Sequence, residues 1–151
     1  MKETDLWKKI REGTKNSGMH WSRIESWASP GIPDLNGCYQ GYEFWIELKV
    51  RRSKRIIVRP HQIAWHYNRI RAGGSSFIVI GDPERGVVDL YTGSVVRSLM
   101  EKDDLDPVWS SLIRRCDWMS MIRTILDHRS VMKDPGSVVD CGDHNDKKEV
   151  A

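Results

Sequence analysis

Two acidic side chains and one amine, Asp34, Glu47 and Lys49, lie close together in the first third of the chain. Glu47 and Lys49 are two residues apart in an apolar run, and a strand alternates its faces with period two, so both side chains lie on one face. Asp34 joins them if a preceding strand pairs with this run. The remaining residues of the run form a uniformly apolar opposite face: Phe44, Ile46, Leu48 and Val50.

Carboxylates that converge on one point suit a hard cation, Mg²⁺ or its substitute Mn²⁺. A lysine beside that ion can position or deprotonate a water, and the three groups together predict metal-assisted hydrolysis of a phosphodiester bond. The alternative is a strand with exposed charges, in which Glu47 and Lys49 form a weak solvated pair and Asp34 is a turn residue. The order and spacing of the three residues favour the metal site.

The pair Pro33-Asp34 followed by Glu47-Leu48-Lys49 resembles the signature of the PD-(D/E)xK nucleases. The wider stretch from Ser29 to Gln62 is similar to the virus-type replication-repair nuclease group (VRR-NUC), with archaeal-type Holliday junction resolvases as near relatives. The resemblance covers roughly residues 5 to 92. It implies an α/β (α+β) fold with a restriction-endonuclease-like core of order αβββαβ, a mixed central sheet flanked by helices, and divalent-metal-dependent cleavage of DNA.

The resemblance also implies roles for single residues. Asp34 and Glu47 are the expected metal ligands, and the backbone carbonyl of Leu48 adds a further oxygen. Lys49 is expected to position the attacking water or to stabilise charge on the phosphate. Gln62, in the first turn of the next helix, is expected to contact phosphate or hold a water. Its alternative role is to satisfy free backbone N–H groups at the helix start.

Nucleases of this class often take a third acid from upstream. Glu25 is the preferred candidate, because it lies on the strand expected just before Pro33-Asp34. Glu12 and Glu3 on the first helix are its rivals, since the junction resolvases take their third acid from such a helix. An exposed surface pair of Arg23 and Glu25 is the competing interpretation.

Positive charge is concentrated in the half of the chain that holds these acids. Residues 1–80 contain 14 Lys/Arg against 7 Asp/Glu, whereas residues 81–151 contain 10 against 14. This asymmetry favours attraction of an anionic polymer. The densest basic run follows directly on Lys49, and we expect it to grip DNA phosphates without reading sequence. Its members are Arg51, Arg52, Lys54, Arg55 and Arg59.

Seven tryptophans are many for 151 residues. Periodicity places Trp7 in the core, whereas Trp45 shares the face of Glu47 and is expected to shape the wall of the site. Others are candidates for stacking on unpaired bases.

Length and composition indicate one soluble globular domain. No apolar run approaches the ~20 residues of a membrane span. The opening residues are too polar for a signal peptide. Three widely spaced cysteines suggest neither a zinc ribbon nor a disulfide framework. We therefore expect a cytosolic protein, in a host cell if the source is viral, with no membrane partner.

Hydrophobic periodicity and turn residues predict the elements. We expect helices over residues 4–16, 60–72, 93–100 and 107–127, and strands over 20–26, 34–39, 43–50, 76–80 and 86–91. The strand over 76–80 is expected to be central. Residues 1–92 are the expected nuclease core, residues 93–128 a helical extension of the same domain, and residues 129–151 a flexible polar tail.

These observations together predict a Mg²⁺-dependent DNA endonuclease of viral or mobile-element type. The small size favours selection by DNA structure, such as a branch, flap or junction, over base sequence. A homodimer is a further expectation, because the junction resolvases work as dimers. Two alternatives remain: a sequence-specific restriction-type nuclease, and an inactive nucleic-acid-binding module on the same fold.

Overall fold

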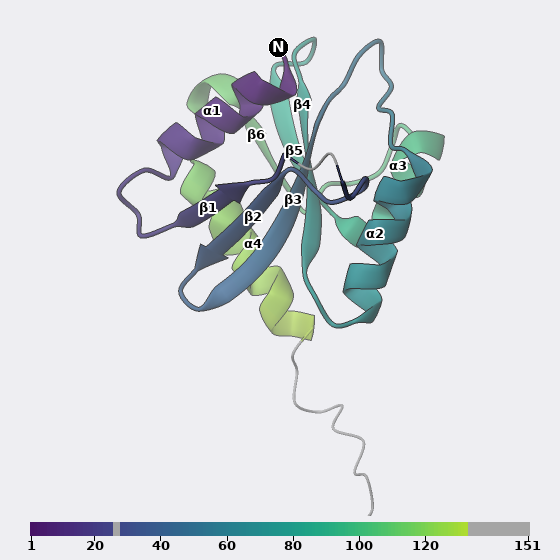
Figure 1. Cartoon of the computed structure of the whole chain (residues 1–151). Helices are drawn as coiled ribbons and strands as arrows, with labels where there is room; N and C mark the ends of the chain where they lie inside the picture. Colours follow the sequence, from purple (N-terminus) through teal and green to yellow (C-terminus); the bar gives the residue numbers. More distant parts are fainter. Residues whose placement is uncertain (26–27, 133–151) are drawn as a thin grey trace, which may run out of the picture.

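One six-stranded sheet organises the molecule, for which a computed structural model describes residues 1–25 and 28–132 (Figure 1). The strand order is β1-β2-β3-β4-β5-β6. The strands are β1 (His20–Arg23), β2 (Leu35–Tyr39), β3 (Tyr42–Val50), β4 (Ser76–Asp82), β5 (Val87–Thr92) and β6 (Trp109–Leu112). The helices are α1 (Glu3–Gly13), α2 (Pro60–Arg71), α3 (Ser98–Glu101) and α4 (Trp118–Met132), with 3-10 turns η1 (Gly93–Val95) and η2 (Ile113–Arg115).

The sheet is mixed. β3 and β4 run parallel, with α2 as the crossover between them, and the other neighbouring strands pair antiparallel. The register sets Glu47 opposite Ile78 and Lys49 opposite Ile80. The observed order αβββαβ from α1 to β4, on a mixed sheet between helices, confirms the expected fold class.

Separate hydrophobic clusters cover the two faces of the sheet. Helices α1 and α4 pack on the face that holds Phe44, Ile46 and Leu48, the apolar side of β3. Helices α2 and α3 pack on the opposite face, over Ile78 and Ile80 of β4. Full burial of an apolar side chain of this size contributes about 1.5–3 kcal/mol. The period of two in β3 therefore fixes which of its faces carries the acids.

Most of the expected elements are confirmed to within a few residues. The strand expected over 20–26 is shorter, because its pairing with β2 ends at Arg23 opposite Leu35. Consequently Glu25 does not lie on the strand. The helix expected over 93–100 is present as η1 followed by α3.

The single helix expected over 107–127 is wrong for its first half, since α4 begins only at Trp118. Residues Trp109–Leu112 form β6, which pairs with β5 at the sheet edge. The helical interpretation used Val108 and Leu112 as an apolar stripe, but these side chains are 39% and 57% exposed. The remaining part is helical, and Ile122 of α4 is buried as expected.

Helix α4 continues to Met132, past residue 129 where a flexible polar tail was expected to begin. Residues 133–151 lie outside the described residues. Within the described ranges, no helix has both the length and the apolar character needed to cross a bilayer.

His66 of α2 is fully buried between this helix and the sheet. Its Nδ1 lies 2.9 Å from the Ser76 hydroxyl oxygen. A Cβ at Gly93 would lie 2.8 Å from the same nitrogen, so only glycine fits there. Among the described residues, Nε2 has no hydrogen-bond partner. Burial, and secondarily the charge of Lys49, lower the His66 pKa from 6.5 to about 4.

We expect His66 to make stability fall as the pH falls from about 6.5 to about 4. In that window the unfolded chain binds a proton that the folded chain excludes, so acid favours unfolding. The shift corresponds to about 3 kcal/mol. The stability advantage of the wild type over His66→Leu should shrink by that order across the window, measured by urea denaturation. A constant difference for His66→Leu across the window would contradict the assignment.

Candidate active site

Asp34 is held at the point where β2 begins, by two backbone contacts from different elements. The amide N–H of Ile24 donates to its carbonyl oxygen at 2.8 Å. The amide N–H of Leu48 donates to its carboxylate Oδ2 at 2.7 Å. The second contact ties the acid directly to β3, so the hairpin that was expected to bring Asp34 to Glu47 does so.

Glu47 is a buried acid, only 3% exposed. Burial, and then the negative charge of Asp34, raise the pKa of its carboxyl to about 8. In the described part of the chain, Glu47 Oε2 has no hydrogen-bond partner. A buried charge without a partner is costly, so this oxygen is well placed to receive a cation.

Gln62 links the acid to the amine. Its Nε2 donates to Glu47 Oε1 at 2.8 Å, and its Oε1 accepts from Lys49 Nζ at 3.2 Å. The same Oε1 also accepts from the backbone N–H of Arg59 at 2.9 Å, which caps α2 next to Pro60. The helix-start role of Gln62 is therefore confirmed, and the same side chain also contacts Glu47 and Lys49.

Lys49 lies beside the acids with little exposure to solvent. Its Nζ is 3.7 Å from Glu47 Oε1, and its side chain is 12% exposed. This burial distinguishes it from a solvated strand lysine. The ammonium group is held where it can act on a group bound at Glu47.

The carbonyl of Leu48 lies on the side of β3 that pairs with β2. Along β3, the amides of Trp45 and Arg51 donate toward the β4 side, to Ser75 and Gly81. A residue in a strand directs its N–H and C=O to the same side. Because the Leu48 N–H points to Asp34, its carbonyl also lies on the β2 side, one step past the pairing of Leu35 with Ile46.

Glu3, in the first turn of α1, is the upstream acid whose charge acts on Glu47. Desolvation beside the site, and then Asp34, raise the pKa of Glu3 itself, although Glu3 is exposed like its two rivals. Glu25, the preferred candidate from sequence, is exposed beyond the end of β1, and Glu12 is exposed near the end of α1, where it pairs with Lys15. The structure thus brings Glu3 closest to the paired acids in electrostatic terms.

Gly31 fits the loop before Asp34 against α2. It has a φ of +97°, in the left-handed region, and a Cβ there would lie 2.5 Å from the His61 carbonyl oxygen. This contact joins the loop to the first turn of the helix that carries Gln62.

The donor set fits a divalent cation with few protein ligands. Over residues 1–25 and 28–132, no group of three or more His, Cys, Asp or Glu side chains is placed to share one metal ion. The two carboxylates and a carbonyl are all oxygen donors, as Mg²⁺ requires, and Mg²⁺ usually keeps several waters. The raised pKa of Glu47 means that a negative charge on this carboxyl is poorly compensated by its surroundings. A bound cation would supply that compensation.

The basic run after Lys49 divides into an anchored part and an exposed part. Arg51 Nε lies 3.6 Å from Asp82 Oδ2, and both side chains are largely buried. Arg51 also donates to the Lys54 carbonyl at 3.2 Å. Arg52 and Arg55 pair through their backbones across a tight turn. The remaining side chains of the run are exposed: Arg52, Lys54, Arg55 and Arg59.

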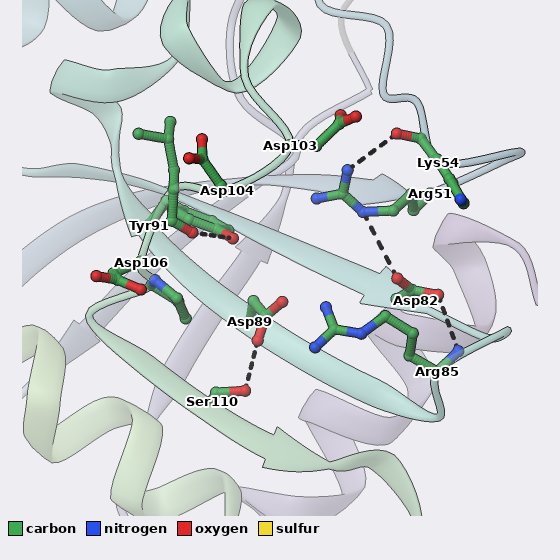
Figure 2. Close-up of a pocket in the computed structure, with 12 residues that line it drawn as sticks. Arg51, Lys54, Asp82, Arg85, Asp89, Tyr91, Asp103, Asp104, Asp106 and Ser110 are labelled. Atoms are coloured by element: carbon green, nitrogen blue, oxygen red, sulfur yellow. Dashed lines mark hydrogen bonds and ion pairs between the residues drawn. The ribbon is translucent and has the colours of Figure 1, made fainter.

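A cavity of about 610 Å³ adjoins Arg51 (Figure 2). Its walls mix charges of both signs, with Arg51 and Arg85 flanking Asp82, and Asp104 on the opposite wall. Ser110 donates a short hydrogen bond to Asp89, which is buried. Sequence reasoning missed this region because its members come from three separate segments. The signal that was available is an acid, Asp89, on the inward face of an apolar strand.

Arg51 is expected to stabilise the fold. Arg51→Gln leaves the buried Asp82 carboxylate with the Arg85 amide as a donor but without its charged partner, and loss of one partner of a buried charge costs about 1–3 kcal/mol. Arg52→Gln is the matched control on the same turn and should change the free energy of unfolding by less than about 0.5 kcal/mol. Urea denaturation of both variants measures the difference. Equal stability of the two would show that the Arg51–Asp82 pair contributes nothing.

No family model matches the chain, and no curated protein matches it. Solved structures with a similar fold include Hjc, a Holliday junction resolvase from the archaeal hyperthermophile Archaeoglobus fulgidus, and a VRR_NUC domain. Hjc is 16% identical, with 61% of this chain and 78% of that chain covered at a TM-score of 0.48. The VRR_NUC domain is 21% identical, with coverages of 55% and 87% and a TM-score of 0.44.

Proposed function

We propose that this protein is a divalent-metal-dependent DNA nuclease that hydrolyses phosphodiester bonds at the paired acids. The observation that carries the proposal is the Glu47 carboxyl, which is buried against Asp34 and has a pKa of about 8. Two acids forced together in this way are unfavourable unless a cation joins them. Lys49 and Gln62 beside them are suited to a phosphate and a water.

The proposed cation ligands are Asp34, Glu47 and the Leu48 carbonyl. Glu3 replaces Glu25 as our proposed upstream acid, acting directly or through a water, because its charge reaches both acids. When bound, Mg²⁺ or Mn²⁺ supplies Lewis-acid stabilisation of the phosphoryl oxygens and lowers the pKa of a water. The chain itself provides the fixed oxygens, which need no rearrangement to receive the ion.

Lys49 is the proposed group that orients the attacking water or neutralises charge that develops on the phosphate. Gln62 holds the Lys49 ammonium and keeps Glu47 Oε1 occupied, which leaves Glu47 Oε2 for the cation. Both residues belong to elements fixed by the core, β3 and α2. Such preorganisation is what makes an electrostatic contribution large.

The exposed cations of the basic run are the proposed contacts to DNA phosphates. Arg52, Lys54, Arg55 and Arg59 lie on the loop between β3 and α2, next to Lys49 and Gln62. Arg51 forms an ion pair with Asp82, and we propose that it stabilises the fold and does not contact DNA. Phosphate contacts position a protein without reading sequence, which favours recognition of DNA structure such as a branch, flap or junction. Action as a homodimer remains part of the proposal.

Asp34→Asn and Glu47→Gln should each abolish Mg²⁺-dependent cleavage of branched DNA. Each change removes one negative oxygen with almost no change in volume. Glu47→Gln replaces a buried carboxyl whose pKa is about 8 with a neutral amide that can still accept from Gln62, so its melting temperature should equal or exceed that of the wild type. The measurements are cleavage of single-strand, duplex, flap, fork and four-way junction substrates, and thermal unfolding with and without Mg²⁺.

The same experiment separates the competing functions. Mg²⁺ should raise the melting temperature of the wild type and leave that of either variant nearly unchanged. Binding of DNA without any cleavage by the wild type would instead identify an inactive binding module. A defined fragment pattern on duplex plasmid would identify a restriction-type nuclease. Cleavage by both variants at the wild-type rate would refute the metal assignment.

Lys49→Ala should lower turnover by about 10²-fold or more while it weakens DNA binding only slightly. The proposed role is at the reacting phosphate, where loss of a positioned proton-transfer or charge-stabilising group is felt in the transition state. Single-turnover cleavage and DNA binding without divalent cation measure the two effects. Arg52→Ala, a change at a more distant exposed cation, should weaken DNA binding and leave turnover nearly unchanged. Unchanged turnover with much weaker binding would reassign Lys49 to DNA attraction.

A further inference from the structure

An aromatic and cationic cluster lies beside the candidate active site and takes no part in it. It consists of Trp45, Trp65 and Arg69. The two indole rings meet at 5.2 Å between centroids, inclined by 61°. The Arg69 guanidinium carbon lies 4.7 Å from the Trp65 ring centroid and 5.4 Å from that of Trp45.

The cluster continues the row of active-site residues along both elements. Trp45 is two residues before Glu47 in β3, so both side chains project from the same face, about 7 Å apart along the strand. On α2, Gln62, Trp65 and Arg69 follow one another at helical spacings of three and four. Gln62 contacts Glu47 and Trp65 contacts Trp45, so the helix stripe follows the strand from the site to the cluster.

The cluster is open to solvent. Both tryptophans are half-buried and Arg69 is exposed. A hollow of about 220 Å³ is lined by Trp45 and Arg69 together with Glu43, Gly74 and Ser75. The neighbouring face of β2 also retains exposure at Asn36 and Cys38, because α1 and α4 cover the opposite face of the sheet.

The chemistry of the cluster matches an unpaired nucleotide. An indole face stacks on any base, and a guanidinium that already lies over the ring can pair with the phosphate beside that base. Arg69 is exposed, and the charged residues that line the hollow are Arg69 and Glu43. Trp45 and Glu47 are close enough for one extended single strand of DNA to contact both.

We propose that Trp45, Trp65 and Arg69 form a subsite for an unpaired nucleotide that adjoins the phosphate held at Glu47. The inference rests on the proposed function and deepens it, because it names single-stranded character as what the site selects. Stacking tolerates every base, so the subsite selects strand form and not sequence. Duplex DNA keeps its bases stacked on each other and cannot use it.

Binding without divalent cation tests the subsite separately from cleavage. The probes are a fluorescently labelled single-stranded oligothymidylate and a blunt duplex of the same length, followed by anisotropy. Arg69→Gln and Trp65→Leu should weaken single-strand binding about tenfold, since stacking contributes about 1–3 kcal/mol per base. Duplex binding should change less than twofold. Trp65→Phe retains an aromatic face and should recover most of the single-strand affinity.

Arg71→Gln is the matched control, because it removes an equal exposed charge from the same helix. Single-strand affinities of Arg69→Gln and Trp65→Leu equal to that of the control would overturn the subsite, as would equal losses on both probes. If circular dichroism shows that Trp65→Leu does not fold, Arg69→Gln still tests the subsite, because Arg69 is exposed. If the wild type cleaves DNA and these variants do not change single-strand binding, the subsite alone is rejected. If the variants bind as expected but the wild type does not cleave, the nuclease proposal alone is rejected.

Discussion

The candidate site depends on the close placement of two acids, which disfavours having both of them ionised. Asp34 and Glu47 are brought together by the β2–β3 pairing, and burial raises the pKa of Glu47 to about 8. The surrounding groups offset this cost: the Leu48 amide donates to Asp34, and Gln62 donates to Glu47. Lys49 supplies nearby positive charge. One oxygen, Glu47 Oε2, is left without such compensation among the described residues.

Sequence patterns predicted the parts that depend on local order. The period of two in β3 assigned Glu47 and Lys49 to one face and Phe44 to the core, and both assignments are confirmed. Pro60 predicted the start of α2, because its fixed φ suits the first helical position. The hairpin joined Asp34 to β3 because the turn sets the register of neighbouring strands.

The parts that sequence could not predict depend on contacts between distant segments. Val108 and Leu112 lie four apart, as in a helix, but the open edge of β5 offers backbone partners that favour a strand. Arg51 appeared to be one more exposed cation until the sheet placed Asp82 beside it. Glu3 reaches the acids only through the packing of α1 on β3, which no short pattern encodes.

The β3–α2 crossover has a consequence for how the site forms and varies. Asp34, Glu47, Lys49 and Gln62 all lie within residues 34–62, joined by one hairpin and one strand-to-helix connection. Contacts of short sequence separation carry a small loop-closure cost. The chemical groups can therefore assemble early, as a unit supported by the core. Insertions after β5 would lengthen the distant edge of the sheet without changing the spacing of these four residues.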